Sequence, residues 1–496
     1  MTRYDVLVVG GGNAGLCAAA AANAAGRTGL RIGILEKAPR AERGGNSALT
    51  GHMRFVCESF ADLLALTPYE AGSSEAAALA DRFTPRTTED YWNETMAVTD
   101  GRADPDQLEV LVRNSYPTMR WLSGLGMRWV ISAGSTTDNA AQLAGGGRQL
   151  QEHNFDLLER AGVDIHYGAS ANRLVTGRDG GVTGVEVLTE QGVVRYDAGC
   201  VVLASGGFES SPQMRAAYLG RGWDTVRMRG VPYNTGEGLR MAVDIGAATA
   251  GSWTSCHASP QDVARPAFGL PSAAHGGGTE WDRYLYPFGI MVNRDGVRFT
   301  DEGADVRSRT YARMGREILA QPGGVAYQIL DAKVRRAGLV DGRYDRGTGA
   351  RADNLADLAT RLGIGPALVD TVTAYNAALR DGSATIVPVT ARDGRGTGDL
   401  WPAKSNFAVP IDEAPFEGYA VCCGITFTFG GLAVDPLRAQ VKHVSGGVVP
   451  GLFAAGEIVG GLWHGNYAGG SGMAAGSIFG KIAGEHAVAA TVDRVA

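Results

Sequence analysis

The sequence has few cysteines, and none of them has the spacing that a metal or redox site requires. Its six cysteines form no Cys-x-x-Cys motif, which excludes a zinc ribbon and the redox disulfide of a flavin disulfide reductase. Scattered thiols of this kind are typical of a reducing compartment. The chain also lacks an apolar run of about 18 residues that could span a membrane. Because the first strand is expected after only three residues, without room for a signal peptide, we expect a cytoplasmic protein.

Concentrated positive charge is also missing. The 46 Lys and Arg residues are outnumbered by 52 Asp and Glu residues, the net charge is −6 and the pI is near 5.8. No dense run of Lys or Arg occurs. Nucleic-acid-binding proteins carry a basic stripe or patch, so no nucleic-acid partner is predicted.

Glycine, in contrast, is present in excess. The chain of 496 residues holds 72 glycines, which is about twice the usual share. They are dispersed through a sequence that is 45% hydrophobic, so this is not a low-complexity chain. A backbone that approaches a large ligand closely at many points would use glycine in this way.

The most informative glycines stand near the N-terminus. Residues 6–9 are apolar and predict a buried strand, which is followed by Gly10, Gly12 and Gly15 and by an alanine-rich helix over residues 16–25. In such a fingerprint the first glycine makes the tight turn, the second admits a pyrophosphate and the third lets helix and strand pack closely. The helix N-terminus adds free N–H groups and the positive end of a dipole. The segment therefore predicts a dinucleotide site.

Two further segments support this site. A second strand over residues 30–35 ends in Glu36, 21 residues after Gly15. A carboxylate at this place accepts hydrogen bonds from a ribose and repels a 2′-phosphate. The loop over residues 44–47, Gly-Gly-Asn-Ser, offers N–H and O–H donors to a planar, polar group rather than side chains to a core.

A β-meander over residues 174–203 distinguishes between dinucleotide folds. Its last strand returns to a turn of small residues, Ala204, Ser205 and Gly206. An FAD-binding domain needs such a meander, whereas a nicotinamide-binding Rossmann domain does not. We predict an α/β fold: an FAD-binding, Rossmann-like domain of the glutathione-reductase type with a β-meander, plus an inserted α+β capping domain.

The composition predicts how these domains follow one another. Residues 1–246 form the first part of the FAD-binding domain, with a helical insertion at about 55–140. Residues 247–390, which are richer in proline, aromatic and charged residues, form the capping domain that covers the substrate. Residues 391–496 return to the FAD-binding domain.

The returning segment carries two more motifs. Gly456 and Glu457 follow a strand, again as glycine and acid. Gly472 and Met473 open a closing helix over residues 474–487. The N-terminal amides of this helix could hold an electron-rich carbonyl oxygen.

Together these residues resemble the fumarate reductase/succinate dehydrogenase flavoprotein superfamily over nearly the whole chain, with the FAD-dependent tricarballylate dehydrogenases as the most similar branch. The resemblance rests on seven segments: residues 44–47, residues 255–258, YPFGIMVNRDGVRF from Tyr286, residues 301–303, residues 404–406, CGITFTFGG from Cys423 and NYAGGSG from Asn466. The cofactor motifs are common to the superfamily, so they indicate FAD but hardly the substrate.

The resemblance implies non-covalent FAD. Glu36 would lie on the adenosine ribose, Glu457 on the ribityl side, and the amides of Gly472 and Met473 at an isoalloxazine carbonyl. No metal site is predicted. The expected cofactor-binding residues are Gly10, Gly12, Asn13, Ala14, Gly15, Glu36, Lys37, Gly44, Gly45, Asn46, Ser47, Ala204, Ser205, Gly206, Gly456, Glu457, Gly472 and Met473.

Two departures from the superfamily bear on the substrate. Tyr467 stands where fumarate reductases place a substrate arginine, and Phe427 lies in the segment where they carry a histidine. Both departures count against fumarate and succinate. Tyr467 also resembles the tyrosine with which 3-ketosteroid Δ1-dehydrogenases bind a ketone oxygen, so the desaturation of a cyclic ketone remains an alternative.

Five residues are expected at the catalytic site. His257 matches the superfamily's substrate-carboxylate histidine by position, with a surface-loop histidine as the alternative. Arg307 and Arg309 both fall near the superfamily's catalytic arginine, and the spacing does not decide between them. His464 and Tyr467 precede the closing helix and are expected near the flavin.

Three more residues are weaker candidates. Arg54 and Arg148 could supply positive charge to the site, although a structural role is the simpler interpretation. His52 does not match the position of the superfamily's covalent flavin histidine, so a covalent link through it is not expected.

The resulting functional hypothesis is an FAD-dependent dehydrogenase that oxidises a C–C single bond beside a carboxylate or carbonyl. The favoured substrate is a small polycarboxylate such as tricarballylate, and the alternative is a cyclic ketone of the 3-ketosteroid type. The resemblance implies an iron–sulfur or membrane electron-transfer partner for the reduced flavin. A non-enzymatic binding module of the kind of the GDP-dissociation inhibitors is a further alternative, which a yellow purified protein would exclude.

Overall fold

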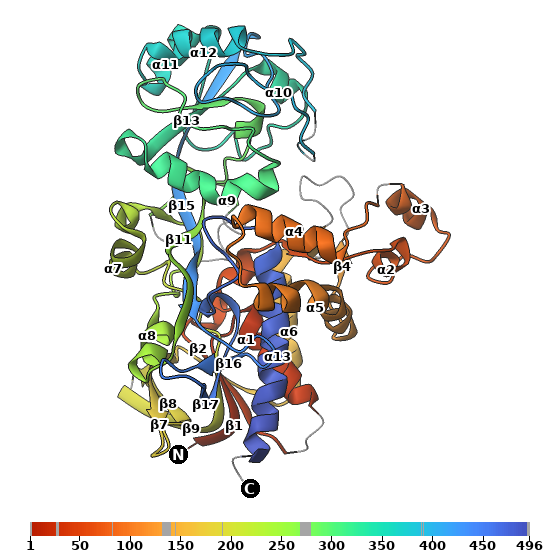
Figure 1. Ribbon diagram of the computed structural model, residues 1–496, viewed down its shortest axis with the longest axis vertical. Coiled ribbons are helices and arrows are strands. Elements are labelled where there is room, and N and C mark those ends of the chain that lie inside the picture. The colour runs from red at the N-terminus through yellow and green to blue at the C-terminus, as the bar shows by residue number, and fades with distance from the viewer. Residues whose placement is uncertain are drawn as a thin grey trace.

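The computed structural model describes residues 2–25, 29–81, 83–130, 140–143, 145–190, 192–267, 279–387, 389 and 391–493. Two large sheets lie toward opposite ends of the molecule, and the long strands β11 (Thr249–Asp262) and β15 (Phe416–Leu432) run between them (Figure 1). A third, small sheet belongs to a helical segment that lies to one side.

The first large sheet has the order β16-β17-β9-β1-β2-β6, and β8 joins β7 to β9. Strand β1 is parallel to β2 and β9, while β7, β8 and β9 form an antiparallel meander. The inner strands are almost wholly apolar because both of their faces are covered. This arrangement confirms the predicted α/β class with its meander. The strands are β1 (Thr2–Val9), β2 (Ile32–Glu36), β6 (Asp164–Tyr167), β7 (Ser170–Thr176), β8 (Val182–Thr189), β9 (Gly192–Leu203), β16 (Gln440–Lys442) and β17 (Val448–Ala454).

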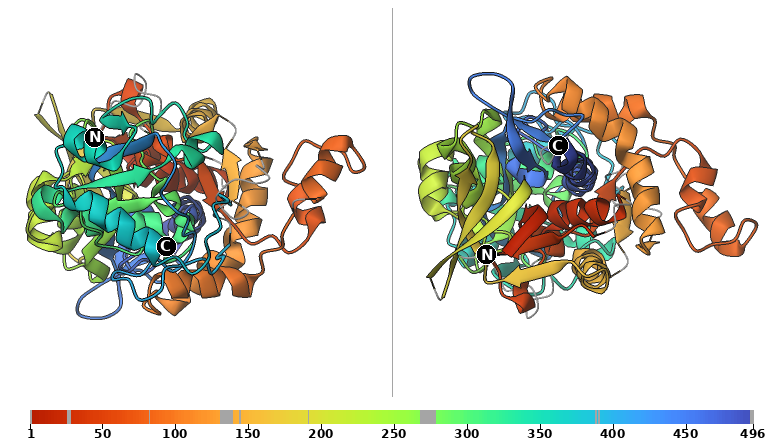
Figure 2. Two further views of the ribbon diagram at one scale, coloured as in Figure 1. Left: turned by 90° about the horizontal axis from the view of Figure 1, so that it is seen from above. Right: turned by 90° about the horizontal axis from the view of Figure 1, so that it is seen from below.

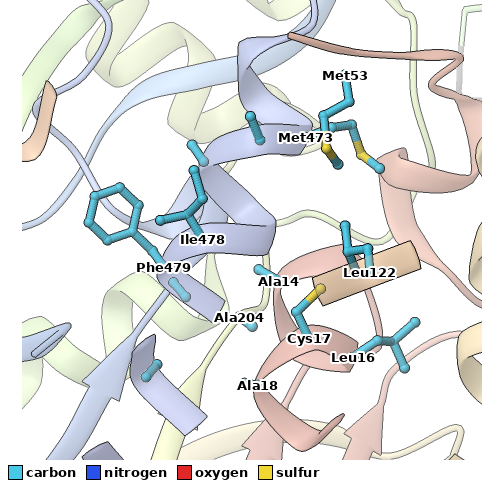
Figure 3. Packing of buried hydrophobic residues seen from close by; sticks show 14 of the residues in the cluster. Ala14, Leu16, Cys17, Ala18, Met53, Leu122, Ala204, Met473, Ile478 and Phe479 are labelled. Atoms are coloured by element: carbon cyan, nitrogen blue, oxygen red, sulfur yellow. The ribbon is translucent and has the colours of Figure 1, made fainter. Parts of the chain in front are cut away.

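Helices α1 (Asn13–Ala24), α6 (Gly146–Arg160) and α13 (Ser471–Asp493) cover this sheet. Figure 3 shows α1 and α13 side by side, joined by small apolar residues. Glycine makes this approach possible: a Cβ atom on Gly480 or Gly484 would lie 2.4 or 2.1 Å from the carbonyl oxygens of Ala14 and Ala18. The two helices are therefore packed backbone against backbone.

The helical insertion projects from the side of the molecule, with α2 and α3 farthest out (Figures 1 and 2). Residues 131–139, which belong to the predicted insertion, lie outside the described residues. Its strands form the order β3-β5-β4. The elements are β3 (His52–Arg54), α2 (Phe60–Leu64), α3 (Ser74–Ala80), α4 (Thr88–Val98), α5 (Pro105–Gly124), β4 (Trp129–Val130) and β5 (Ala140–Leu143).

The second large sheet has the order β10-β15-β13-β12, and β11 and β14 also pair with β15. It takes β10 and β15 from outside residues 247–390, so the division of the chain at residues 247 and 390 stays a prediction. Its strands are β10 (Arg227–Met228), β11, β12 (Ile290–Val292), β13 (Val325–Leu330), β14 (Gly349–Ala352) and β15. The helices of this region and its approaches are α7 (Pro212–Met214), α8 (Glu237–Asp244), α9 (Arg307–Leu319), α10 (Ala332–Arg336), α11 (Leu355–Leu362) and α12 (Ala367–Ala377).

The contact between α1 and α13 yields a stability prediction. Gly484→Ala should destabilise the protein by about 2 kcal/mol, because neither backbone can yield to the added methyl group. The melting temperature should fall by about 3 °C. The control is Gly124→Ala at the exposed end of α5, where an added Cβ meets nothing within 4 Å. Equal melting temperatures for the two variants in a thermal unfolding experiment would contradict the close packing.

Candidate active site

A cavity of about 1220 Å³ lies between the two large sheets. One half is lined by the loop after β1, the loop over residues 45–52, the turn after β9 and the N-terminal turns of α13. The other half is lined by side chains of β11, α9 and β15. Sixteen of the 18 expected cofactor residues line this cavity, and the exceptions are Gly15 and Gly44.

The glycines of the fingerprint differ in what surrounds them. A Cβ on Gly10 would lie 2.4 Å from the Ala204 carbonyl oxygen, and one on Gly15 would lie 2.0 Å from the Gly10 carbonyl oxygen. Both glycines are therefore required by the fold itself. On Gly12, in contrast, a Cβ would project into the cavity, with the nearest protein atoms 3.9 Å away. This open cradle at the N-terminus of α1 fits the pyrophosphate of a dinucleotide.

Glu36, the carboxylate predicted to bind the ribose, lies at the end of β2. Its carboxylate is 6% exposed and accepts hydrogen bonds from the N–H groups of Gly11 (2.8 Å) and Ala38 (2.7 Å). Burial raises its pKa above the usual range. Two oxygens offer more lone pairs than these two N–H groups occupy, so Glu36 retains acceptor capacity toward the cavity.

Aromatic rings surround His257 in the other half of the cavity. The His257 ring is stacked on Phe427, with 5.4 Å between ring centroids. It meets the edges of Tyr311 at 4.9 Å and Tyr467 at 5.3 Å. We call His257, Tyr284, Tyr311, Phe427 and Tyr467 the aromatic cage; all five line the cavity.

His257 is neutral in this cage. It is 2% exposed, and its Nδ1 atom has no hydrogen-bond partner among the described residues. Burial and the charge of Arg229 lower its pKa to about 3. The structure thus places this predicted residue in the cavity wall rather than in a surface loop.

Tyr467 connects the cage to the closing helix. Its hydroxyl oxygen accepts a hydrogen bond from the Gly472 N–H group at 2.8 Å. Burial raises the pKa of this phenol, so it stays protonated. Because the oxygen is the acceptor in that bond, the hydroxyl proton can be donated to a ligand atom.

The structure distinguishes the two candidate arginines. Arg307, the first residue of α9, lines the cavity, and its guanidinium lies 5.7 Å from the Tyr284 ring centroid. Arg309, two residues further along the helix, pairs with Glu94 at 3.1 Å. Arg54 pairs with the same carboxylate at 2.5 Å. Neither Arg309 nor Arg54 is among the described residues that line the cavity.

Of the remaining predicted residues, two line the cavity and one does not. Arg148 and His52 line the cavity. His464 does not belong to the described lining, although its neighbour Trp463 does.

Arg229, Asp282 and Tyr311 are among the lining residues that were not expected from the sequence. Arg229 and Asp282 form a buried pair through two hydrogen bonds of 2.8 and 3.0 Å, and Arg229 also donates to Thr426 at 3.1 Å. Burial disfavours its charge, but Asp282 holds the pKa of Arg229 above its usual range. The two residues are 53 positions apart and have no common motif, so no sequence signal predicts the pair. Tyr311, on α9, completes the cage.

Two classes of feature are absent from the part of the chain that the structure describes. No helix there is both long and apolar enough to cross a bilayer. No three or more His, Cys, Asp or Glu side chains are grouped there so that they could hold a metal ion.

Comparison with known proteins identifies relatives along the whole chain. A sequence family described as "FAD binding domain" matches residues 70–473. A "Fumarate reductase (cytochrome)" of Shewanella frigidimarina is 27% identical over 97% of this chain and 76% of its own length. A "4-oxocyclohexanecarboxylate 2-dehydrogenase" of Sinomonas cyclohexanicum is 28% identical over 94% of this chain and 90% of its own length. The crystal structure of 3-ketosteroid Δ1-dehydrogenase from Sterolibacterium denitrificans has the same fold, with a TM-score of 0.73, 20% identity, and coverage of 99% of this chain and 100% of that one.

The open space at Gly12 yields a binding prediction. Gly12→Val should fold normally, because the fold leaves room for the side chain, but should lose FAD, because the side chain fills the cradle. The purified variant should be colourless with an unchanged melting temperature of the apoprotein. Gly342→Val, in an exposed loop where nothing lies within 4 Å of the added Cβ, is the control and should stay yellow. Stoichiometric FAD in the Gly12→Val protein after gel filtration would disprove the assignment.

Proposed function

Because the chain belongs to the FAD binding domain family, within the fumarate reductase/succinate dehydrogenase flavoprotein superfamily, we propose that it dehydrogenates a C–C bond beside a ring carbonyl. That it is an FAD-dependent oxidoreductase acting on carbon–carbon bonds follows from the family and its relatives. Bound FAD supplies the hydride acceptor for such a reaction. The finer proposal concerns the substrate and the residues that bind it.

The observation that carries this proposal is the hydroxyl of Tyr467 inside the aromatic cage. The Gly472 N–H group donates to the Tyr467 hydroxyl oxygen, so the hydroxyl proton of Tyr467 is the donor that is left for a ligand in the cavity. Donors of this kind stabilise the negative charge that develops on a carbonyl oxygen when a proton leaves the adjacent carbon. The flat faces of Phe427 and Tyr311 suit the apolar body of a ring.

The cations of the cavity bear on the competing polycarboxylate proposal. A tricarboxylate such as tricarballylate needs about two or three cationic partners in a site that excludes water, since each unpaired buried carboxylate costs several kcal/mol. Arg229 is already bound to Asp282 through two hydrogen bonds. Arg309 and Arg54 are engaged by Glu94. In our proposal Arg307 binds one acidic group of the substrate. Tricarballylate remains the second candidate because Arg148 and Arg343 also line the cavity.

One relative supports a ring substrate with one acidic group, whereas the Shewanella relative is named for fumarate. The printed name of the Sinomonas protein describes a cyclohexanone that carries a single carboxylate. In our proposal the Tyr467 hydroxyl donates a hydrogen bond to the carbonyl oxygen of such a compound, and Arg307 binds its acidic group. The neutral His257 ring forms part of the wall against which the substrate packs.

Two finer points complete the proposal. FAD is held non-covalently, by the cradle at Gly12 and the loop over residues 44–47. Reduced flavin passes its electrons to an iron–sulfur or membrane electron-transfer partner, in line with the cytochrome in the name of the Shewanella relative.

A substrate panel with an artificial electron acceptor tests this function. The holoenzyme should oxidise saturated cyclic ketones, and those with one carboxylate best, with kcat/KM at least about a hundredfold above that for tricarballylate or succinate. Tyr467→Phe should lower kcat/KM by a factor of about a hundred or more, because a donor to the developing oxyanion is lost. Arg307→Ala should act mainly on KM.

The matched control is Arg309→Lys, which keeps a positive charge beside Glu94 and should retain full activity. A panel in which tricarballylate is the best substrate, together with a nearly inactive Arg307→Ala variant and an active Tyr467→Phe variant, would overturn the ring-carbonyl proposal in favour of the polycarboxylate.

A further inference from the structure

Two glutamates meet beside the dinucleotide half of the cavity. Glu209 lies in the loop after β9 and is fully buried. Its Oε1 atom accepts hydrogen bonds from the side-chain amides of Asn46 at 2.8 Å and Asn234 at 2.6 Å. Glu457, in the short helix η8 (Gly456–Ile458), lines the cavity. Both carboxyl groups reach the backbone at Gly207.

The backbone around the pair holds the two carboxyl groups together. Glu457 Oε1 accepts hydrogen bonds from the N–H group of Thr428 at 2.9 Å and from its hydroxyl at 3.3 Å. A Cβ on Gly207 would lie 2.3 Å from Glu457 Oε1 and 2.9 Å from Glu209 Oε2. Both carboxyl groups thus converge over a residue without a side chain. Glu209 Oε2 is buried and has no hydrogen-bond partner among the described residues, so a proton carried by the Glu457 carboxyl group would satisfy it.

The charges around the pair do not balance two carboxylates. Arg215 is the cation that faces Glu209, and its Nη1 donates to the Glu209 backbone carbonyl at 2.5 Å. The Cys256 thiol, which also faces Glu209, stays neutral because burial raises its pKa above the usual range. Burial and the neighbouring carboxyl group raise the pKa of Glu457 well above its usual value. Two carboxylates that converge on one backbone position, one of them fully buried, cannot both ionise beside one cation.

We propose that Glu209 and Glu457 share a single proton across the hydrogen bond between them, and that this singly charged pair anchors the hydroxyl-bearing chain of FAD through Glu457. The inference rests on FAD as the cofactor and is independent of the substrate proposed above. Glu209 is a positioning residue here: it holds the proton that lets Glu457 remain in a buried wall. A nearby hydroxyl of the cofactor can then donate to the remaining lone pairs of Glu457.

This arrangement makes the retention of FAD depend on pH. Without FAD the cavity admits water to Glu457, so the shared proton is lost at a lower pH than in the closed holoenzyme. Between the pKa of the pair in the apoprotein and its higher pKa in the holoenzyme, the dissociation constant of FAD should rise by up to about tenfold per pH unit. Alkaline pH therefore weakens FAD binding. Below the pKa of the pair in the apoprotein, the dissociation constant is at its lowest and no longer depends on pH.

The decisive variant is Glu209→Gln. The replacing amide can accept the two asparagine donors with its oxygen and donate to Glu457 with its NH2 group, so it mimics the protonated partner permanently. The dissociation constant of FAD, measured by the quenching of flavin fluorescence from about pH 6 to about pH 9, should stay within about twofold of wild type at the acidic end and should lose its alkaline rise. Glu457→Gln should weaken binding at every pH, because the ionised acceptor faces the cavity there.

Glu237→Gln is the matched control. Glu237 also lines the cavity but pairs with Lys37 at 2.8 Å rather than with a carboxyl group. This variant should keep the alkaline rise of wild type. Infrared difference spectra between the wild-type and Glu209→Gln holoenzymes at about pH 8 supply the second measurement: they should contain the C=O stretch of one protonated carboxyl group.

Three results would overturn the proposal. One is an alkaline rise of the dissociation constant that is the same in Glu209→Gln as in wild type. Another is an infrared difference spectrum without a protonated carboxyl band. A Glu209→Gln protein that folds but loses FAD at all pH values would likewise show that Glu209 acts as a plain anion.

Discussion

The rest of the structure depends on one contact, the packing of the first helix against the last. Asn13, at the start of α1, donates hydrogen bonds to the Met473 carbonyl at 3.2 Å and to the Ser477 hydroxyl at 2.9 Å, both on α13. Further along, Gly480 and Gly484 on α13 let the two backbones touch. Figure 3 shows the two helices side by side. This contact fixes the N-terminal turns of two helices on one cavity, although Asn13 and Met473 are 460 positions apart in the chain. One terminus offers its amides to phosphate, and the other offers them to the reacting end of the cavity.

Much of the cofactor half could be predicted from the sequence because its signals are local. A strand, three glycines, a helix and an acid follow one another within 36 residues, and each has a steric or electrostatic reason. The substrate half could not be predicted to the same depth. The choice between Arg307 and Arg309 depends on where α9 begins and which face turns to Glu94. Contacts between distant segments, such as Arg229 with Asp282 or Glu209 with Glu457, leave no trace in residue spacing.

The two halves of the cavity differ in the polar and charged groups that line them. The cofactor half is built from backbone amides and buried carboxyl groups, which suit hydroxyl groups and phosphates. In the substrate half, most charges are paired: Arg229 with Asp282, and, behind the wall, Arg309 and Arg54 with Glu94. Aromatic rings, the Tyr467 hydroxyl and the arginines Arg148, Arg307 and Arg343 also line the cavity. In our proposal such a wall selects a ligand by its shape and by one oxygen atom more than by net charge.

The most direct test of this account is the affinity of the holoenzyme for a series of para-substituted phenols, which imitate a ring enolate without reacting. If Tyr467 and the α13 amides stabilise negative charge on a ring oxygen, the dissociation constants should fall steadily as the phenols become more acidic. The bound phenols should then show the absorbance of the phenolate. Dissociation constants that do not vary with phenol acidity, or tight binding of tricarballylate with no binding of phenols, would contradict the central claim.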